Sequence, residues 1–118
     1  MILGIGVDLV ELNRLKELLD DRLINRILSP EEQKLYENIA AENTKLSFLG
    51  GRFASKEAIF KAISKGPGKT RFVDFSILND ENGKPYVKTD FFMNNEIVHI
   101  SITHTDFFAI AYVMIEKL

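Results

Sequence analysis

The residues with the clearest capacity for chemistry lie in one short stretch, GGRFASKEAIFKA, at positions 50–62. Wound as a helix at about 100° per residue, this stretch has Arg52 and Lys56 inside an arc of large apolar side chains, with Glu57 and Lys61 at the border of that arc. Buried charges are costly unless they are paired, hydrogen-bonded or bound to a metal. The four charged side chains therefore need partners.

A surface explanation of these charges is also open. Glu57 and Lys61 have the i,i+4 spacing of an exposed ion pair, which contributes only about 0.3 kcal/mol, and Arg52 and Lys56 would then extend along apolar surface to reach water. The other side of the same helix has a row of small residues at four-residue spacing: Gly50, Ala54, Ala58 and Ala62. A helix that is small or apolar on nearly all sides is normally buried.

Asp8 is a second carboxylate that needs an explanation. It lies near the end of an apolar N-terminal segment, where it caps a following helix, pairs with a cation or binds a metal. Two carboxylates that leave positions open for water and phosphate oxygens are the usual protein ligands of Mg²⁺. Arg52, Lys56 and Lys61 would supply phosphate partners beside such an ion. Together with the carboxylate of the helix, Asp8 therefore indicates metal-phosphate chemistry.

His104 ends the segment EIVHISITH, where alternation places it in one row with Val98, Ile100 and Ile102. A single histidine at such a position is either a structural group or, because it lies at the loop end of a strand, a phosphate contact. The run from Gly66 to Lys69 lacks the pattern of a nucleotide-binding loop, and we interpret it as a helix end.

Length and composition limit the possible functions. The 118 residues are expected to form one domain, residues 1–118, and the net charge of −2 excludes nucleic-acid binding by overall charge. The absence of cysteine excludes disulfides, thiolate zinc sites and cysteine nucleophiles. The apolar start of the chain is short and has no basic flank, so we expect no signal peptide, and no apolar run is long enough to span a membrane. We therefore expect a cytoplasmic protein.

The elements that must position these residues are helices first and strands afterwards. Residues 2–10 have the pattern of a buried strand whose Gly4 and Gly6 indicate close approach of another backbone. Residues 11–28 predict one long amphipathic helix or two short ones, and Ser29 and Glu32 form a capping box that begins another. The helix that contains the charged stretch is expected from about Leu46 to Ser64.

After this helix the apolar period changes from about 3.6 to 2. Four strands are expected, in the segments FVDFSIL from Phe72, KPYVKTDF, EIVHISITH and FFAIAYVMIE. Asn82-Gly83 predicts a hairpin turn between the first two, and His104-Thr105-Asp106 predicts one between the last two. The order of elements predicts an α+β fold with a mostly antiparallel sheet.

Four segments occur in a familiar order: GIGVDLVEL, FASKEAIFKA, GKPYV and HISITHTDFFAIAYV. In this combination the chain resembles the small bacterial holo-acyl-carrier-protein synthases, a branch of the 4'-phosphopantetheinyl transferases, over essentially its whole length. The resemblance implies their fold and the Mg²⁺-dependent transfer of the 4'-phosphopantetheine arm of coenzyme A to a serine of apo-acyl carrier protein. The reaction would release adenosine 3',5'-bisphosphate and support fatty acid biosynthesis.

The same resemblance implies roles for individual residues. Asp8 and Glu57 would hold Mg²⁺, and Lys61 would meet the phosphates and protonate the leaving group. The base is left open between Glu57 and a metal-bound water that Asp8 positions. Arg52 and His104 match positions that contact CoA phosphates.

Other implied contacts cross between protein chains. Lys84 and Pro85 match a loop near the adenine that a neighbouring subunit contributes, and the family resemblance implies a homotrimer with active sites between subunits. Arg14, Leu18, Arg22 and Arg26 recur at four-residue steps and would form one stripe on a continuous helix. We expect this stripe to bind the acidic carrier protein, with Leu18 as the apolar anchor. Acidic neighbours make an ordinary solvated face the alternative.

Two other functions use the same features. One is a different Mg²⁺-dependent phosphotransferase or nucleotide hydrolase, with the same carboxylates and lysine. The other is a non-catalytic module that binds CoA or acyl carrier protein, in which the charges of the helix only anchor phosphate.

Overall fold

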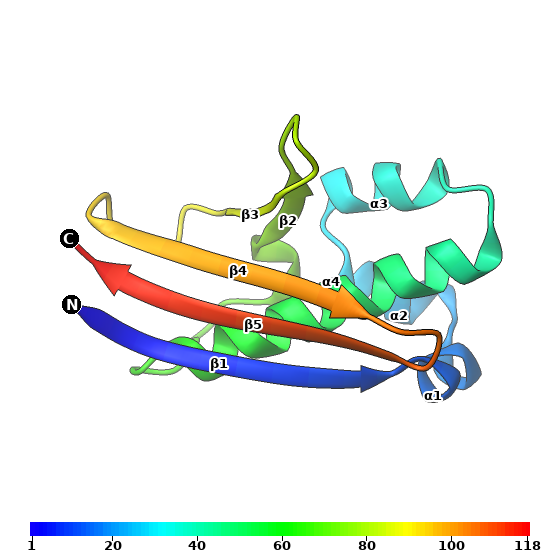
Figure 1. Cartoon of the computed structure of the whole chain (residues 1–118), viewed down its shortest axis with the longest axis horizontal. Helices are drawn as coiled ribbons and strands as arrows, with labels where there is room; N and C mark the ends of the chain where they lie inside the picture. The colour runs from blue at the N-terminus through cyan, green and yellow to red at the C-terminus, as the bar shows by residue number, and fades with distance from the viewer.

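One long helix packs against a three-stranded antiparallel sheet at the centre of the structure (Figure 1). The structure is a computed structural model that describes residues 1–118. Its elements are β1 (Ile2–Glu11), α1 (Leu12–Leu18), α2 (Asp21–Ile27), α3 (Pro30–Glu37), α4 (Glu42–Ala62), the 3-10 helix η1 (Phe72–Asp74), β2 (Ser76–Asn79), β3 (Pro85–Lys88), β4 (Glu96–His104) and β5 (Phe108–Lys117). The expected α+β fold is confirmed.

The strands form two antiparallel sheets. The larger has the order β1-β5-β4, and β2 and β3 form a separate hairpin that lies beside β4. The turn at Asn82-Gly83 closes this hairpin as expected, and Gly83 has a positive φ of 81°. The first and last strands are neighbours, so Met1 and Lys117 exchange hydrogen bonds of 2.8 and 2.7 Å at one end of the sheet.

Two strands are shorter than the alternation predicts. Residues 72–74 form a 3-10 helix instead of a strand, because Asp74 Oδ2 accepts a hydrogen bond from the Arg71 N–H at 2.8 Å and closes a turn. The next strand ends at Lys88, because Thr89 Oγ1 donates to the Asp74 carbonyl and accepts from the Phe91 N–H. Local side-chain hydrogen bonds compete here with the sheet ladder.

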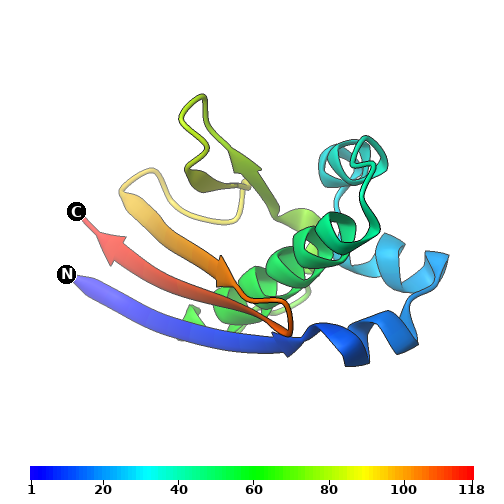
Figure 2. The same cartoon turned by 45° about the vertical axis from the view of Figure 1, so that its right-hand side comes forward.

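Residues 11–28 form two short helices, the second of the two expected alternatives. Leu19 is extended, with φ −67° and ψ 119°, and Asp20 then caps α2 by accepting a hydrogen bond from the Leu23 N–H at 2.8 Å. Both helices lie beyond the end of β1 and point in different directions (Figure 2). The break follows from the Asp20 side chain, which favours a new helix N-terminus.

The alanine row of α4 packs inside the chain, against β1. Ala54, Ala58 and Ala62 are buried, and the helix itself begins at Glu42, four residues earlier than expected, and ends at Ala62. A Cβ atom added to Gly6 would lie 2.0 Å from the Ala58 carbonyl oxygen. The close approach expected from the two glycines of β1 is thus confirmed, and packing within one subunit explains the alanine row.

Lys56 is completely buried in an ion pair with Glu32 of α3. Its Nζ also donates to the Ile27 carbonyl at the end of α2, at 2.6 Å. Glu32 in addition completes the expected capping box with Ser29 and accepts a hydrogen bond from the Ile77 N–H of β2 at 2.8 Å. Burial lowers the pKa of Lys56, and the charge of Glu32 opposes this effect. The alternative in which Lys56 extends to water is therefore wrong.

None of the helices combines the length and apolar character that a membrane span requires.

The contact between β1 and α4 generates a stability prediction. Gly6→Ala should lower the free energy of unfolding by at least about 2 kcal/mol, because the new methyl group would overlap rigid backbone. Gly51→Ala is the matched control: its Cβ would meet only the flexible Ile102 Cγ2 at 3.3 Å, and alanine favours the helix, so its stability should stay within about 1 kcal/mol of the parent. Urea unfolding of the three proteins measures both values, and equal effects would contradict the close packing.

Candidate active site

Asp8 and Lys61 form the centre of the candidate site. Asp8 is in β1, opposite Ala111 of β5, and its side chain lies on the side of the sheet that faces α4. Lys61, in the last turn of α4, donates to Asp8 Oδ1 at 2.9 Å and to the Val7 carbonyl at 3.1 Å. The Asp8 side chain is 19% exposed and that of Lys61 54%. The close packing of β1 on α4 therefore places a carboxylate and an ammonium group side by side at the surface.

Two alternatives for these residues are wrong. Asp8 caps no helix, because it lies inside β1 and the N-cap of α1 is Glu11, which makes no side-chain cap. Lys61 pairs with Asp8 and not with Glu57, so the simple i,i+4 pair on the surface of α4 does not form. Asp8 is the better partner because β1 crosses α4 at this turn.

Glu57 lies beside Asp8 in a pocket of about 250 Å³. Burial raises the pKa of Glu57, and the like charge of Asp8 raises it further, whereas Lys61 and Arg26 act in the opposite direction. Glu57 takes part in no ion pair within 4.0 Å. Two carboxylates thus line one pocket, and only Asp8 has a cationic partner within 4.0 Å.

The donor set fits a hard divalent cation. No cluster of three His, Cys, Asp or Glu side chains is present, so a closed all-protein metal site is absent. Mg²⁺ usually binds one or two carboxylates and keeps water or phosphate oxygens in its other positions. Asp8 and Glu57, which repel each other in this open pocket, match that requirement.

Arg52 is turned to the opposite side of α4. Its Nε donates to the Ile77 carbonyl of β2 at 3.2 Å, and its guanidinium lies over the Phe48 ring, 3.9 Å from the centroid. Only 7% of the residue is exposed, so it does not extend to water, yet its Nη2 is buried without a hydrogen-bond partner. An unpaired buried donor on a charged group is unfavourable. Arg52 therefore has a free N–H donor for the predicted phosphate contact, but this donor does not lie in the pocket of Asp8 and Glu57.

Three further predicted CoA contacts lie away from that pocket. His104 is exposed at the end of β4, which is the opposite edge strand from β1. Lys84 precedes β3 in the hairpin turn, and Pro85 is the first residue of β3. None of the three lines the pocket of Asp8 and Glu57. The structure thus divides the predicted site residues into one group near β1 and a second group near β4 and the β2–β3 hairpin, at the opposite edge of the sheet.

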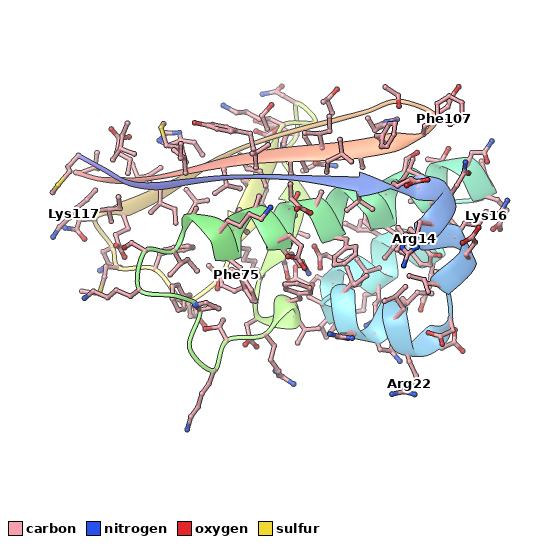
Figure 3. The ribbon with its side chains drawn as sticks, turned by 90° about the horizontal axis from the view of Figure 1, so that it is seen from below. Arg14, Lys16, Arg22, Phe75, Phe107 and Lys117 are labelled. Atoms are coloured by element: carbon pink, nitrogen blue, oxygen red, sulfur yellow. The ribbon has the colours of Figure 1, made fainter.

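The predicted carrier-binding stripe is not continuous. Arg14 and Leu18 are in α1, whereas Arg22 and Arg26 are in α2, because the capping of α2 by Asp20 breaks the helix. Figure 3 shows Arg14 beneath the end of β1 and Arg22 directed away from it. Arg14 and Leu18 line the pocket of Asp8 and Glu57. A single helical stripe is therefore wrong, but half of it borders the candidate site.

Two neighbours of the site escaped sequence reasoning. Glu32 was expected only as a capping residue, and nothing in its spacing indicates that it pairs with Lys56. Arg26 lies close enough to act on the charge of Glu57, although its four-residue spacing indicated only a role in the stripe. Both contacts depend on how α2 and α3 pack against α4, and helical periodicity carries no information about this packing.

Comparisons with known proteins agree with this arrangement. Residues 4–113 match the family model described as the 4'-phosphopantetheinyl transferase superfamily. The holo-[acyl-carrier-protein] synthase of Staphylococcus haemolyticus is 46% identical over 121 residues, which cover 99% of this chain and 98% of the relative. That of Acholeplasma laidlawii is 46% identical over 116 residues and 98% of each chain.

A solved structure extends the agreement to three dimensions. The holo-(acyl-carrier-protein) synthase from Bacillus anthracis, in complex with CoA (3',5'-ADP), superimposes with a TM-score of 0.89 at 40% identity over 100% of this chain and 99% of that one. The chain belongs to the holo-[acyl-carrier-protein] synthase family. Members of this family are phosphopantetheinyl transferases, which favours a transferase over the nucleotide hydrolase and the non-catalytic binding module.

The raised pKa of Glu57 generates a prediction about stability and pH. With a metal chelator at pH 8, Glu57→Gln should be more stable than the parent, because the parent must hold a partly buried carboxylate beside Asp8. A carboxyl group whose pKa is higher in the folded protein than the ordinary 4.5 binds its proton more tightly when folded. The parent therefore loses stability as the pH rises from the ordinary pKa of 4.5 through the higher pKa of Glu57 in the folded protein. Below that pH range the stability advantage of Glu57→Gln should vanish.

Urea unfolding at pH 4, 6 and 8 measures this difference. Glu37→Gln, an exposed change on α3, is the control and should follow the parent at each pH. A stability difference between Glu57→Gln and the parent that does not change with pH would contradict the assigned environment of Glu57.

Proposed function

We propose that this protein transfers the 4'-phosphopantetheine arm of coenzyme A to a serine of apo-acyl carrier protein, with Mg²⁺, and releases adenosine 3',5'-bisphosphate. Its product would be the holo-carrier used in fatty acid biosynthesis. The observation that supports this most directly is the convergence of Asp8, Glu57 and Lys61 at one open pocket in a chain of this family. The relative from Bacillus anthracis binds CoA (3',5'-ADP), which supports CoA as the donor.

Asp8 and Glu57 are the residues that would hold Mg²⁺, and the ion would supply positive charge to the pyrophosphate of CoA when bound. In the reaction a bond forms between the serine oxygen and phosphorus, and the bond from that phosphorus to the bridging pyrophosphate oxygen breaks. The serine proton passes to Glu57 or to a water positioned by Asp8. Both bases fit the pocket.

Lys61 would stabilise the leaving group. Its side chain is half-exposed, so substrate phosphate can reach it, and the contacts of its Nζ with Asp8 and the Val7 carbonyl fix its position. An ammonium group placed there donates a hydrogen bond, and finally a proton, to the oxygen of the departing 3',5'-bisphosphate. The contact is most valuable after the bond to phosphorus has begun to break, because the oxygen then gains negative charge.

We also propose that a neighbouring subunit completes the site in a homotrimer. Arg52 contacts β2, Lys84 and Pro85 belong to the β2–β3 hairpin, and His104 ends β4. These elements lie at the edge of the sheet opposite β1, where Asp8 lies, so one CoA molecule would meet both groups where two subunits adjoin. Their roles would be phosphate binding by the first two and adenine binding by the hairpin.

The outer face of the sheet supports this assembly. Ile5, Val7 and Leu9 of β1 are 59, 56 and 54% exposed, and the exposed aromatic residues Phe108 and Tyr112 lie beside them on β5. A contiguous apolar surface on a small chain is typical of a subunit interface. β1 and β4 are also unpaired edge strands, which proteins commonly protect by association.

The carrier protein would dock at α1. Arg14 and Leu18 border the pocket that contains Glu57, so a carrier helix seated there would place its serine close to the reacting phosphate. Arg14 would pair with an acidic residue of the carrier and Leu18 would be the apolar anchor. Arg22 and Arg26 of α2 would add positive charge that attracts the carrier rather than continue the same stripe.

The first test is a transfer assay. Apo-carrier protein incubated with CoA, Mg²⁺ and this protein should gain the mass of phosphopantetheine in a mass spectrum. Asp8→Ala and Glu57→Ala should each lower kcat by more than about 100-fold, since each removes a ligand of the Mg²⁺ ion whose charge stabilises the transition state. Both variants should keep the parent's circular dichroism. Glu37→Ala is the exposed control, and near-normal turnover by Asp8→Ala at limiting Mg²⁺ would show that the metal assignment is wrong.

Lys61→Ala separates leaving-group stabilisation from binding. We expect kcat to fall by at least about 100-fold with a smaller change in the KM for CoA, because the contact strengthens in the transition state. A raised KM with unchanged kcat would make Lys61 a binding residue only.

Mixed trimers test the shared site. Asp8→Ala and His104→Ala chains should each be impaired at limiting CoA. The two variants, mixed in equal amounts by denaturation and refolding, should recover about one quarter of the parent activity. An active interface needs an intact Asp8 from one subunit and an intact His104 from its neighbour, and each of these has an independent probability of about one half. Activity equal to the mean of the two separate variants would place the whole site in one subunit, and a fully active monomer in sedimentation would exclude the trimer.

A further inference from the structure

A second pocket lies on the other side of Glu57, between α2, α4 and η1. Its volume is about 360 Å³, and six residues line it: Asn25, Arg26, Phe60, Arg71, Phe72 and Val73. None of the proposed catalytic or CoA-binding residues is among them. Of its lining residues, only Arg26 has a role in the function described above, as part of the charge that attracts the carrier.

The two pockets are joined by a row of aromatic rings. Phe72 packs on Phe60 with ring centroids 4.9 Å apart and on Phe53 with centroids 5.9 Å apart. Phe53 lines the first pocket together with Glu57, and Phe60 follows Glu57 by one turn of α4. Phe60 is also held from the interior by the buried Phe75, at 5.8 Å. The second pocket is thus a firm apolar surface continuous with the candidate site.

Positive charge borders this apolar surface on two sides. Arg26 approaches from α2 and is near enough to lower the pKa of Glu57. Arg71 approaches from the chain before η1, with a side chain that is 75% exposed and a long contact of 3.6 Å to Asp74. Such an exposed pair contributes little, so the Arg71 guanidinium can bind another carboxylate at small cost. The pocket therefore suits an apolar side chain that has acidic neighbours.

The pantetheine end of CoA is a poor match for these charges. The anionic part of CoA has its proposed partners at Lys61, Arg52 and His104, and the pantetheine arm that could extend toward the second pocket is uncharged. Two guanidinium groups at the rim need an anionic partner to use them. The acidic macromolecule that the reaction itself brings to this surface is the carrier protein.

We propose that Arg26, Arg71, Phe60 and Phe72 form a second docking subsite for the acyl carrier protein. An apolar side chain of the carrier enters between the two rings, and flanking carboxylates of the carrier pair with the two arginines. The subsite rests on the proposed function. It adds a contact on the far side of Glu57 from Arg14 and Leu18, so that the carrier is held on both sides of its serine.

Arg71 is the residue with which to test the subsite, because it touches the pocket but none of the catalytic groups. Arg71→Glu should raise the KM for apo-carrier protein by about tenfold, as expected for reversal of one rim charge. The KM for CoA and the midpoint of thermal unfolding should stay within experimental error of the parent. Arg71→Lys keeps the charge and should recover most of the carrier affinity, whereas Arg71→Gln, which adds no repulsion to Asp74, should fall between the two.

Lys69→Glu is the matched control. Lys69 is exposed two residues earlier in the same loop and does not line the pocket, but its reversal changes the net charge by the same amount. It should raise the carrier KM by less than about twofold once salt screens long-range attraction. An Arg71→Glu effect no larger than that of Lys69→Glu would overturn the subsite, as would an effect confined to the KM for CoA.

The experiment also separates this inference from the proposed function. A parent protein that leaves apo-carrier unmodified in the mass spectrum would overturn the transferase activity. Calorimetric titration of apo-carrier protein into the parent, Arg71→Glu and Lys69→Glu then tests the subsite directly. Weaker binding by Arg71→Glu alone supports it, and equal binding by all three proteins, or no binding by any, overturns it.

Discussion

The ion pair between Glu32 and Lys56 holds together four parts of the chain that otherwise share little surface. Its carboxylate accepts hydrogen bonds from the N–H of Ser29, the N-cap of α3, and from the Ile77 N–H of β2, and its ammonium group donates to the Ile27 carbonyl at the end of α2. Both groups are completely removed from water. A buried pair of this kind contributes modest net stability, but loss of either partner leaves an uncompensated charge that typically costs about 3 to 5 kcal/mol. The pair therefore restricts how α2, α3 and β2 can be arranged around α4.

This restriction reaches the candidate site through neighbouring residues in the sequence. Lys56 precedes Glu57, and Ile27, whose carbonyl binds Lys56, follows Arg26. When Lys56 points into the interior, the next side chain on α4 points toward β1, where Asp8 lies. The same bond brings Arg26 near Glu57. A structural interaction on one side of α4 thus determines which charges meet on the other.

Sequence reasoning succeeded where the signal is local or periodic. The capping box at Ser29, the turn at Gly83 and the glycine positions of β1 each depend on short-range geometry, and all are present in the structure. The residue types indicated Asp8 and Glu57 as a carboxylate pair for Mg²⁺, the family resemblance implied the same pair, and the structure brings both into one pocket. The position of Asp8 in the sequence, just before a predicted helix, had also allowed it to be the N-cap of that helix.

The failures concern contacts between elements. Four-residue spacing predicted one stripe from Arg14 to Arg26 only for a continuous helix, and the Asp20 cap divides it. The partner of Lys56 lies 24 residues away, on a helix whose orientation no periodic pattern specifies. Charges in an apolar arc indicated that partners must exist, but their identity depends on tertiary packing.

The pairing of the first strand with the last has a consequence for the order of assembly during synthesis. Asp8 is opposite Ala111, so the ladder between β1 and β5 joins residues separated by almost the whole chain. Contacts of such long sequence separation form slowly, because a large loop must close before they are made. On the ribosome, β1 therefore cannot form its ladder with β5 until residues 108–117 have left the exit tunnel. Asp8 therefore reaches its working environment only after β5, about 100 residues later in the chain, has been translated.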